Sequence, residues 1–484
     1  MSGRNLAQLA EETHERRGDY DALCFEGTWF RSAELLDRGA RLARGLVELS
    51  VRPGDRVVVM MENSPDVGVV YHAIARAGAV VTPVIFLVSS DELRRLIRDA
   101  EPALVIASPL VLETVEAAAG DVRVVTDLDE HERGDPLPIV PRSDGDLAAL
   151  VYTGGTTGSA KGVMLTHANL WEAGRRGHEA GHVDGIDRSL SCLPLSHSYG
   201  LLVLNVSLHH PGRPQSVLMR WFEAEAWLKL AQEHRTQIAP VVPSMLYLLL
   251  RERLEDYDLS DLRYVASGAA PLAAEAIEQF VRRVPGVEIR EGYGLTETSA
   301  LVSTNRPGGI RYGTVGVPVP GTEVRIVEGE VCVRSDLLMT GYWNAPELTA
   351  ETIRDGWLYT GDMGRLDDDG YLTILDRKKD LILRGGFNVF PRDVEEALLE
   401  HPAVATACVL GRPDEVHGEE VVAFVTLSEE IVPDELVAFG KQRLGGYKYP
   451  REIHVLDALP LTPVGKLDRK ALRERLTLQG GMTK

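Results

Sequence analysis

Cysteine is scarce in this chain of 484 residues, and its four cysteines lie far apart without a CxxC pair. That usage argues against a disulfide framework and fits a reduced, cytoplasmic compartment. Long apolar runs are also missing: the one near Leu201 covers about ten residues, half of the ~20 that a membrane-spanning helix needs. The polar N-terminus has no apolar core of the kind found in signal peptides. We therefore expect neither a signal peptide nor a transmembrane segment.

An excess of positive charge is lacking as well. Lysine and arginine number 52 against 72 aspartates and glutamates, which gives a formal net charge of −20. Nucleic acids and anionic membranes bind basic surfaces, so neither is expected as a partner. The length exceeds that of one ordinary domain and predicts two or more folded units, in a monomer or a homodimer.

The apolar pattern predicts an α/β fold followed by antiparallel strands. Continuous apolar runs at 56–61, 79–84 and 103–107 read as buried strands, with helices between them, one of which has a capping box at Ser89 and Glu92. Such alternation predicts parallel strands covered by helices on both faces. After about residue 300, hairpin-like segments predict antiparallel sheet. Helices that begin at Pro391 and Pro433 indicate a small C-terminal unit.

A segment rich in glycine and threonine follows the apolar run LAALV. Residues 152–163 of this segment are YTGGTTGSAKGV, which predicts a loop. The backbone N–H groups and hydroxyls of such a loop can surround phosphate oxygens, because few side chains keep the backbone away. It is not a Walker loop: Lys161 does not directly follow a glycine, and Gly162 stands where serine or threonine belongs. A plain glycine turn is the alternative.

This loop resembles the phosphate-binding signature of the adenylate-forming superfamily, which includes acyl-CoA synthetases, luciferases and peptide-synthetase adenylation domains. Gly154 stands where many members have serine. Further segments match in the family's order from about residue 20 to 475, most like a fatty-acyl- or aryl-CoA synthetase. The resemblance implies that the phosphates of ATP contact Thr153, Gly154, Gly155, Thr156, Thr157, Gly158 and Lys161.

The fold implied by the resemblance has two domains. A large N-terminal domain (1–376) would contain doubly wound α/β subdomains and a β-barrel-like subdomain. A hinge (377–380) would connect it to a small, mobile α+β C-terminal domain (381–484) that carries the catalytic lysine.

The segment EGYGLTET, at 291–298, resembles the family's adenine and magnesium segment. Thr296 would contact the α-phosphate, and Glu297 would bind Mg²⁺, which prefers carboxylate and phosphate oxygens. A solvated surface glutamate is the alternative for Glu297. By the same resemblance, the purine slot is formed by Glu291, Gly292, Tyr293 and Gly294 on one wall and Gly268, Ala269 and Ala270 on the other.

Two further motifs complete the nucleotide site by resemblance. YTGD, at 359–362, is similar to the ribose-binding segment, in which Asp362 accepts the ribose hydroxyls and Arg377 assists. PVGK, at 463–466, is similar to the signature of the catalytic lysine. A carboxylate and an α-phosphate ~4 Å apart repel by about 4 kcal/mol at an effective dielectric near 20. The ammonium of Lys466 would turn this repulsion into attraction; a solvated surface lysine is the alternative.

His197, in PLSHSYG, matches the family position that gates the carboxylate pocket, with a hydrogen-bonded core histidine as the alternative. No acidic residue lies between Arg188 and Glu223 to balance a substrate ammonium, so we expect a fatty or aryl acid rather than an amino acid. Core packing is the alternative for apolar neighbours such as Val241 and Leu246. The predicted pocket residues are His197, Ser198, Tyr199, Val242 and Gly294.

Other polar clusters read as structural. His209-His210 and His417-Gly418-Glu419 have no ligand-type partners at metal spacing. Asp367 to Asp369 suggests half a calcium loop, but a hairpin turn explains it better.

The resemblance also implies that the C-terminal domain rotates between adenylation and thioester formation, so that a pantetheine arm can replace Lys466. Lys379, in DRKKD, would be the hinge residue, and Gly385 and Gly386 would line the thiol tunnel. Without the resemblance, DRKKD reads as a solvated charge run. The 320–340 region leaves no room for the insertion found in carrier-protein ligases, which favours coenzyme A as acceptor.

The sequence thus predicts an AMP-forming acid–thiol ligase of fatty acid metabolism that uses ATP, Mg²⁺ and coenzyme A. Transfer to the phosphopantetheine of an acyl carrier protein is the alternative. A luciferase-like oxygenase shares every motif, whereas an inactive binding paralogue predicts loss of Lys466, Glu297 or Asp362, which are all present. A nicotinamide dehydrogenase is disfavoured, because the early strands lack GxGxxG.

Overall fold

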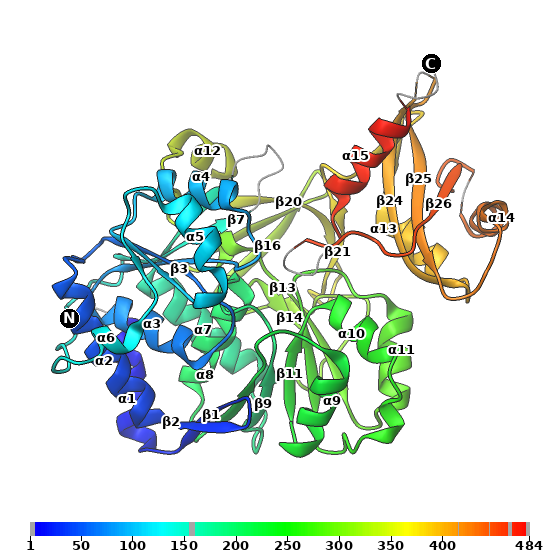
Figure 1. The fold of residues 1–484 in the computed structure, drawn as a ribbon. Coiled ribbons are helices and arrows are strands. Elements are labelled where there is room, and N and C mark those ends of the chain that lie inside the picture. The colour runs from blue at the N-terminus through cyan, green and yellow to red at the C-terminus, as the bar shows by residue number, and fades with distance from the viewer. Residues whose placement is uncertain (1–4, 154–159, 415, 445, 463–466, 481–484) are drawn as a thin grey trace. The chain divides into compact units, whose positions relative to one another are not determined.

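Two compact units make up the chain (Figure 1), and the computed structural model describes residues 5–153, 160–414, 416–444, 446–462 and 467–480. The first unit comprises Met1–Leu272, Ala276–Val324 and Val333–Leu358. The second comprises Ala273–Glu275, Arg325–Cys332 and Tyr359–Lys484. The boundary expected at 376 and the hinge expected at 377–380 fall inside the last of these segments and stay predictions.

A seven-stranded sheet lies in the first unit, in the order β18 (Gly341–Tyr342), β8 (Lys161–Thr166), β7 (Leu147–Thr153), β4 (Val80–Val84), β3 (Arg56–Met60), β5 (Leu104–Ala107) and β6 (Val124–Val125). The strands from β7 to β6 pair in parallel, and β8 is antiparallel to β7 and β18. Val57 and Val59 pack with α2 (Ser32–Glu48) and α3 (Pro65–Arg76), whereas Val58 and Met60 pack with α4 (Ser90–Ala100) and α5 (Leu112–Ala119). Helices therefore cover both faces, which confirms the predicted α/β layering.

A nine-stranded sheet forms the rest of this unit's core, in the order β15 (Val317–Pro318), β14 (Ser303–Thr304), β13 (Glu288–Tyr293), β12 (Tyr264–Ser267), β11 (Ile238–Val241), β9 (Arg188–Ser191), β10 (Gln215–Leu218), β1 (Asp21–Phe25) and β2 (Thr28–Arg31). Its central strands from β13 to β1 are parallel. Residues such as Trp227, Leu246 and Phe280 form one apolar layer with it, on α9 (Ala224–Glu233), α10 (Pro243–Leu250) and α11 (Ala274–Arg283). A separate apolar cluster joins α7 (His167–Gly181) to α8 (Ser198–His209).

Antiparallel strands follow residue 300, as predicted. A five-stranded sheet contains β16 (Thr322–Val327), β17 (Glu330–Ser335), β20 (Trp357–Leu366), β19 (Ile353–Arg354) and β21 (Leu372–Arg377). The Asp367 carboxylate accepts hydrogen bonds from the backbone N–H groups of Asp369 and Tyr371. The acidic run is therefore the turn of the β20–β21 hairpin, as predicted.

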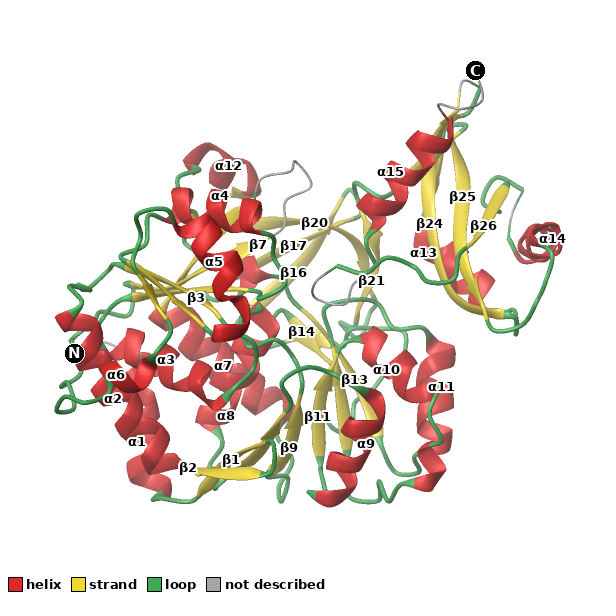
Figure 2. Cartoon of the chain, viewed as in Figure 1, coloured by secondary structure: helices red, strands yellow, loops and turns green. Residues whose placement is uncertain are grey.

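The C-terminal sheet has the order β23 (Phe387–Val389), β22 (Ile382–Arg384), β25 (Gly418–Leu427) and β24 (Val404–Asp414), with β26 (Glu452–Val455) parallel to β25. Val409 faces a layer with α13 (Pro391–Leu399) and α14 (Pro433–Arg443), and its neighbours Cys408 and Leu410 face α15 (Arg469–Gly480). Figure 2 shows these strands and helices by colour. The small α+β unit that the sequence predicts is confirmed.

Helix starts follow local chemistry. Ser89 caps α4 as predicted: its hydroxyl accepts from the N–H of Glu92, whose carboxylate accepts from the N–H of Ser89 at 3.0 Å. Pro391 and Pro433 begin α13 and α14, where the missing proline N–H has no helical partner to lose. The other helices include α1 (Leu6–Arg17), α6 (Leu128–His131) and α12 (Pro346–Thr352). Among the described residues, no helix combines the length and the apolar character that a membrane crossing requires.

Candidate functional site

The carboxyl ends of β12 and β13 lie side by side, since Ser267 and Glu291 are register partners. Gly268 follows β12 directly, and a Cβ at this position would lie 3.6 Å from the carbonyl oxygen of Gly292. Ala269 has a φ of +71°, a left-handed conformation that is rare outside glycine. The structure therefore brings the two predicted walls of the purine slot together at one sheet edge, where ligands bind in open α/β sheets.

The chain turns sharply after β13. A Cβ at Gly294 would lie 2.2 Å from the carbonyl oxygen of Ala300, so only glycine fits there. Thr296, which is buried, donates from its hydroxyl to the Ser198 hydroxyl at 3.2 Å. This contact joins the segment after β13 to the first residue of α8.

His197 is the N-cap residue of α8. Its Nδ1 accepts from the N–H of Tyr199 at 3.2 Å, so the neutral ring carries its proton on Nε2. The Tyr199 hydroxyl donates to the carbonyl of Ala266 at 3.0 Å, and burial raises the pKa of this phenol. The Tyr199 ring lies against Gly268, where a Cβ would be 3.3 Å from the ring. His197 and Tyr199 are thus fixed beside the end of β12.

Val242, another predicted pocket residue, is buried and immediately precedes α10. Its neighbours Val241 and Leu246 are fully buried in the apolar cluster of the nine-stranded sheet. This placement of Val241 and Leu246 is the one that the core-packing alternative predicts.

Glu297 has a partner that the sequence gave no reason to expect. The hydroxyl of Tyr342 donates to Glu297 Oε1 at 2.8 Å, and the N–H of Met339 donates to the Glu297 carbonyl at 2.8 Å. The Nζ of Lys161 lies 5.3 Å from the centroid of the Tyr342 ring. Burial first, and then the Glu297 charge, raise the pKa of Tyr342, so that its hydroxyl remains a donor. This ring also borders a cavity of about 620 Å³ lined by residues such as Met164.

The predicted phosphate loop is described only at its stems. Thr153 and Lys161 are register partners at the end of the β7–β8 hairpin where the chain passes from one strand to the other. The remaining loop residues and the predicted catalytic lysine lie outside the described residues: Gly154, Gly155, Thr156, Thr157, Gly158 and Lys466.

In the second unit, the predicted ribose residues contact each other. Arg377 Nε lies 2.6 Å from an oxygen of Asp362, whose side chain is 4% exposed. Lys378 donates to Glu330 at 2.8 Å, and Asp380 accepts from an arginine of α15 at 2.6 Å. Desolvation lowers the pKa of Lys379. The three basic residues of DRKKD are exposed, as the alternative of a solvated charge run predicts, although Arg377 and Lys378 are paired with acids. Asp380 is the buried member of the run.

Gly385 and Gly386 form the turn between β22 and β23, with φ of +57° and +82°. The N–H of Gly385 donates to the carbonyl of His417 at 2.7 Å. Next to the turn, Arg384 makes two hydrogen bonds of 2.5 and 3.0 Å to Glu420, and both side chains are 10% exposed. The glycine turn is thus tied to β25 by a buried ion pair.

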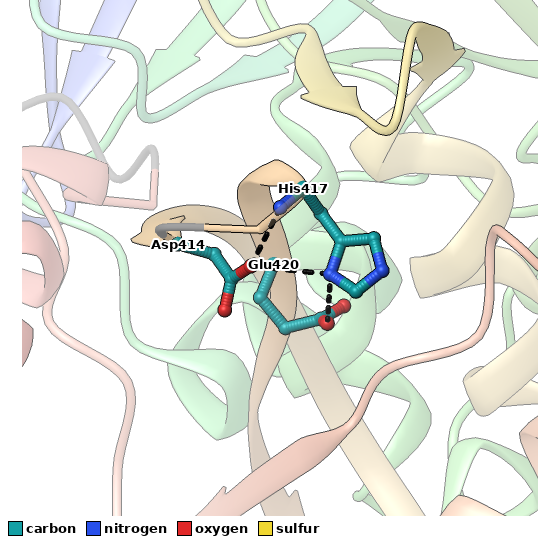
Figure 3. Close-up of side chains that lie close together, drawn as sticks. All are labelled: Asp414, His417 and Glu420. Carbon is teal, nitrogen blue, oxygen red and sulfur yellow. Dashed lines mark hydrogen bonds and ion pairs between the residues drawn. The ribbon is translucent and has the colours of Figure 1, made fainter.

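Asp414, His417 and Glu420 bring three possible ligand atoms within 4.8 Å of one another (Figure 3). The expectation that His417 has no ligand-type partners is therefore wrong, because a turn between β24 and β25 brings both acids back to it. Yet Asp414 accepts from the backbone and ring of His417, and Glu420 is neutralised by Arg384. These contacts explain the cluster as a hydrogen-bonded turn. Both ring nitrogens of His210 likewise have hydrogen-bond partners, as a structural role predicts.

Comparison with known families and proteins places this geometry in context. Residues 10–343 match the family described as AMP-binding enzyme, and residues 393–466 match the AMP-binding enzyme C-terminal domain. A long-chain-fatty-acid–CoA ligase of Bacillus subtilis (strain 168) is 33% identical, covering 99% of this chain and 95% of that protein. A feruloyl-CoA synthase of Streptomyces sp is 36% identical, covering 93% and 94%.

Solved structures with a similar fold cover nearly all of this chain. The anthranilate CoA ligase AuaEII, in complex with anthranoyl-AMP, has a TM-score of 0.92 at 26% identity and covers 99% of this chain and 98% of its own. ATP-bound MatB from Rhodopseudomonas palustris has a TM-score of 0.90 at 30% identity, with 98% and 99% covered.

Proposed function

Since this chain belongs to the AMP-binding enzyme family, we propose that it uses ATP to convert a carboxylic acid to an acyl-AMP and then transfers the acyl group to coenzyme A. The observation that carries the proposal is the close approach of Gly268 to the backbone of Gly292 at the carboxyl ends of two parallel strands. Thr296 and Glu297 follow shortly after the second of these strands. Flat rings and phosphates bind at such edges.

The first step joins a carboxylate oxygen to the α-phosphorus of ATP and breaks its bond to pyrophosphate. Thr296 would donate to the α-phosphate, and Lys466 would lie between the two anions. Glu297 would hold Mg²⁺: its carboxylate is the hard oxygen ligand that this ion prefers, and Oε1 accepts a hydrogen bond from a neutral hydroxyl. The ion, when bound, would neutralise the charge of the leaving pyrophosphate.

In the second step the sulfur of the thiol attacks the acyl carbon, loses its proton, and AMP leaves with the bridging oxygen. We assign Asp362 and Arg377 to the ribose, Lys379 to the hinge, and Gly385 and Gly386 to the thiol tunnel. The ion pair between Asp362 and Arg377 supports the first assignment, because it fixes the carboxylate for a diol. The left-handed glycine turn supports the last, since no side chains block a pantetheine arm there.

The substrate we propose is a fatty or aryl acid. The pocket candidates Tyr199 and Val242 are buried, and no acidic residue lies between Arg188 and Glu223 to hold a substrate ammonium. The relatives named as long-chain-fatty-acid and feruloyl ligases agree with this class. An acyl carrier protein as acceptor, a cytoplasmic location, and a monomeric or dimeric state stay predictions.

A panel of carboxylic acids with ATP and coenzyme A tests the function, with pyrophosphate and thioester measured separately. We expect both products from at least one fatty or aryl acid. Suppose instead that pyrophosphate is released without thioester, and that thioester forms once a phosphopantetheinylated carrier protein is added. The acceptor would then be the carrier protein rather than coenzyme A. No pyrophosphate from any acid would overturn the proposal.

A further inference from the structure

Tyr342 contacts two groups of the proposed nucleotide site at once. Its hydroxyl donates to the Glu297 carboxylate at 2.8 Å, and its ring lies under the ammonium of Lys161 at 5.3 Å. The two partners are separated by more than a hundred residues in the sequence, on β8 and just after β13. A single side chain thus connects the stem of the phosphate loop to the candidate magnesium ligand.

The structure holds Tyr342 firmly in this place. It pairs with Val163 in the β18–β8 ladder, and its N–H donates to the Thr349 hydroxyl at 2.8 Å. The residue is 6% exposed and belongs to the core cluster of the seven-stranded sheet. The N–H of Met339, three residues before it, binds the Glu297 carbonyl, so that both ends of Glu297 are tied to the same segment.

We propose that Tyr342 is a positioning residue that orients the carboxylate of Glu297 for Mg²⁺ and the ammonium of Lys161 for the phosphates. The inference rests on the proposed function. Mg²⁺ demands near-ideal octahedral geometry and tolerates little rotation of a ligand. A neutral hydroxyl fixes one carboxylate oxygen without cancelling the negative charge, whereas a lysine or arginine partner would compete with the ion. The aromatic face holds an ammonium while leaving its N–H groups free to donate.

Tyr342→Phe separates the two contacts, because it removes the hydroxyl and keeps the ring. We expect the Mn²⁺ affinity of the full-length protein, measured by electron paramagnetic resonance with α,β-methylene-ATP present, to fall about tenfold. The Mg²⁺ concentration for half-maximal pyrophosphate release should rise by a similar factor, with kcat restored at high Mg²⁺. Tyr342→Leu, which also lacks the ring, should in addition raise the KM for ATP.

Tyr264→Phe is the matched control. Tyr264 is also a buried tyrosine of the first unit, with a hydroxyl that donates to the Gly181 carbonyl and a cation, Arg290, over its ring at 3.8 Å. We expect this variant to keep the wild-type Mn²⁺ affinity. Equal losses in both variants, or an unchanged affinity in Tyr342→Phe, would overturn the inference.

A double-mutant cycle with Glu297→Gln shows whether the hydroxyl acts through Glu297. The loss from Tyr342→Phe should shrink when Glu297 is already replaced, whereas additive losses would contradict the route proposed here. Wild-type protein that releases no pyrophosphate with any acid would refute the proposed function instead. The cycle measures nucleotide-dependent Mn²⁺ binding alone, so the two failures are distinguishable.

Discussion

The two units hold the charged residues of the candidate site in different ways. In the first unit, Glu297 accepts from a neutral tyrosine hydroxyl. In the second, Asp362 and Glu420 each pair with an arginine, and Lys378 pairs with Glu330. A neutral donor leaves a carboxylate its charge and so its affinity for a cation, whereas an ion pair fixes a shape at the expense of that charge. This difference is what the proposed roles require: a metal ligand in the first unit and ordered loops in the second.

The largest effect should come from Lys466, the lysine of the second unit that we propose stabilises the negative charge of the transition state. We expect Lys466→Ala to lower acyl-AMP formation by roughly 10²–10³-fold, because the variant loses a cation that stabilises the negative charge developing in the transition state. Thioester formation from supplied acyl-AMP should be almost unchanged. Both half-reactions are measured by rapid quench, and equal losses in the two would contradict the proposed alternation of the second unit.

Glu297→Gln tests the first unit's side of the comparison. The amide keeps the size and one oxygen but loses the charge, so we expect pyrophosphate release to fall about 100-fold at fixed Mg²⁺. The fall should be partly relieved by raising Mg²⁺. Asp362→Asn is the counterpart in the second unit and should raise the KM for ATP with no change in the Mg²⁺ requirement. The comparison fails if both variants respond to Mg²⁺ alike.

Arg384→Gln tests the buried pair beside the glycine turn. Removal of Arg384 leaves the buried Glu420 carboxylate without its arginine partner, so we expect a loss of about 3 kcal/mol in the free energy of unfolding of the second unit. The KM for coenzyme A should rise while acyl-AMP formation is retained, because Gly385 and Gly386 are next in the chain. Urea titration and half-reaction kinetics measure the two effects.

The control is Arg443→Gln, which breaks an exposed pair with Glu400 in the same unit, where the side chains are 51% and 54% exposed. It should cost less than about 1 kcal/mol. A loss as large as that of Arg384→Gln would show that burial does not distinguish the two pairs.

A final effect, absent at neutral pH, concerns one neutral group of the first unit. His167 is fully buried at the start of α7, and burial lowers its pKa from 6.5 to about 4. The folded state therefore disfavours the protonated ring, so stability is full above pH 6.5 and falls towards pH 4 as the unfolded state takes up the proton. This group contributes a slope of about 1.4 kcal/mol per pH unit. His167→Asn should flatten the decline of unfolding free energy with acid, and an unchanged slope would exclude His167 as its source.

The sequence predicted what depends on local pattern. The apolar runs from Arg56 predicted covered parallel strands, and Ser89, Pro391 and Pro433 marked helix starts, because each signal lies within a few residues. It missed Tyr342, whose partner Glu297 lies 45 residues away and whose own segment carries no charge pattern. It also missed the Asp414 and His417 contact, which a turn in the backbone creates.

The sequence also could not show which distant residues contact a given segment. The basic residues of DRKKD are exposed, as its composition suggests, yet Glu330 and an α15 arginine bring opposite charges to the run from distant segments. Apolar character alone likewise could not separate the core residues Val241 and Leu246 from pocket candidates. The motifs predicted the candidate site residues, and the tertiary structure shows which side chains contact them.

Transfer of ¹⁸O from a labelled carboxylic acid tests the central chemistry most directly. If the acid attacks the α-phosphorus and the thiol then displaces AMP, the AMP isolated after thioester formation should contain one ¹⁸O atom, detected by mass spectrometry. Label in inorganic phosphate, or unlabelled AMP alongside thioester, would contradict an acyl-AMP intermediate in this protein.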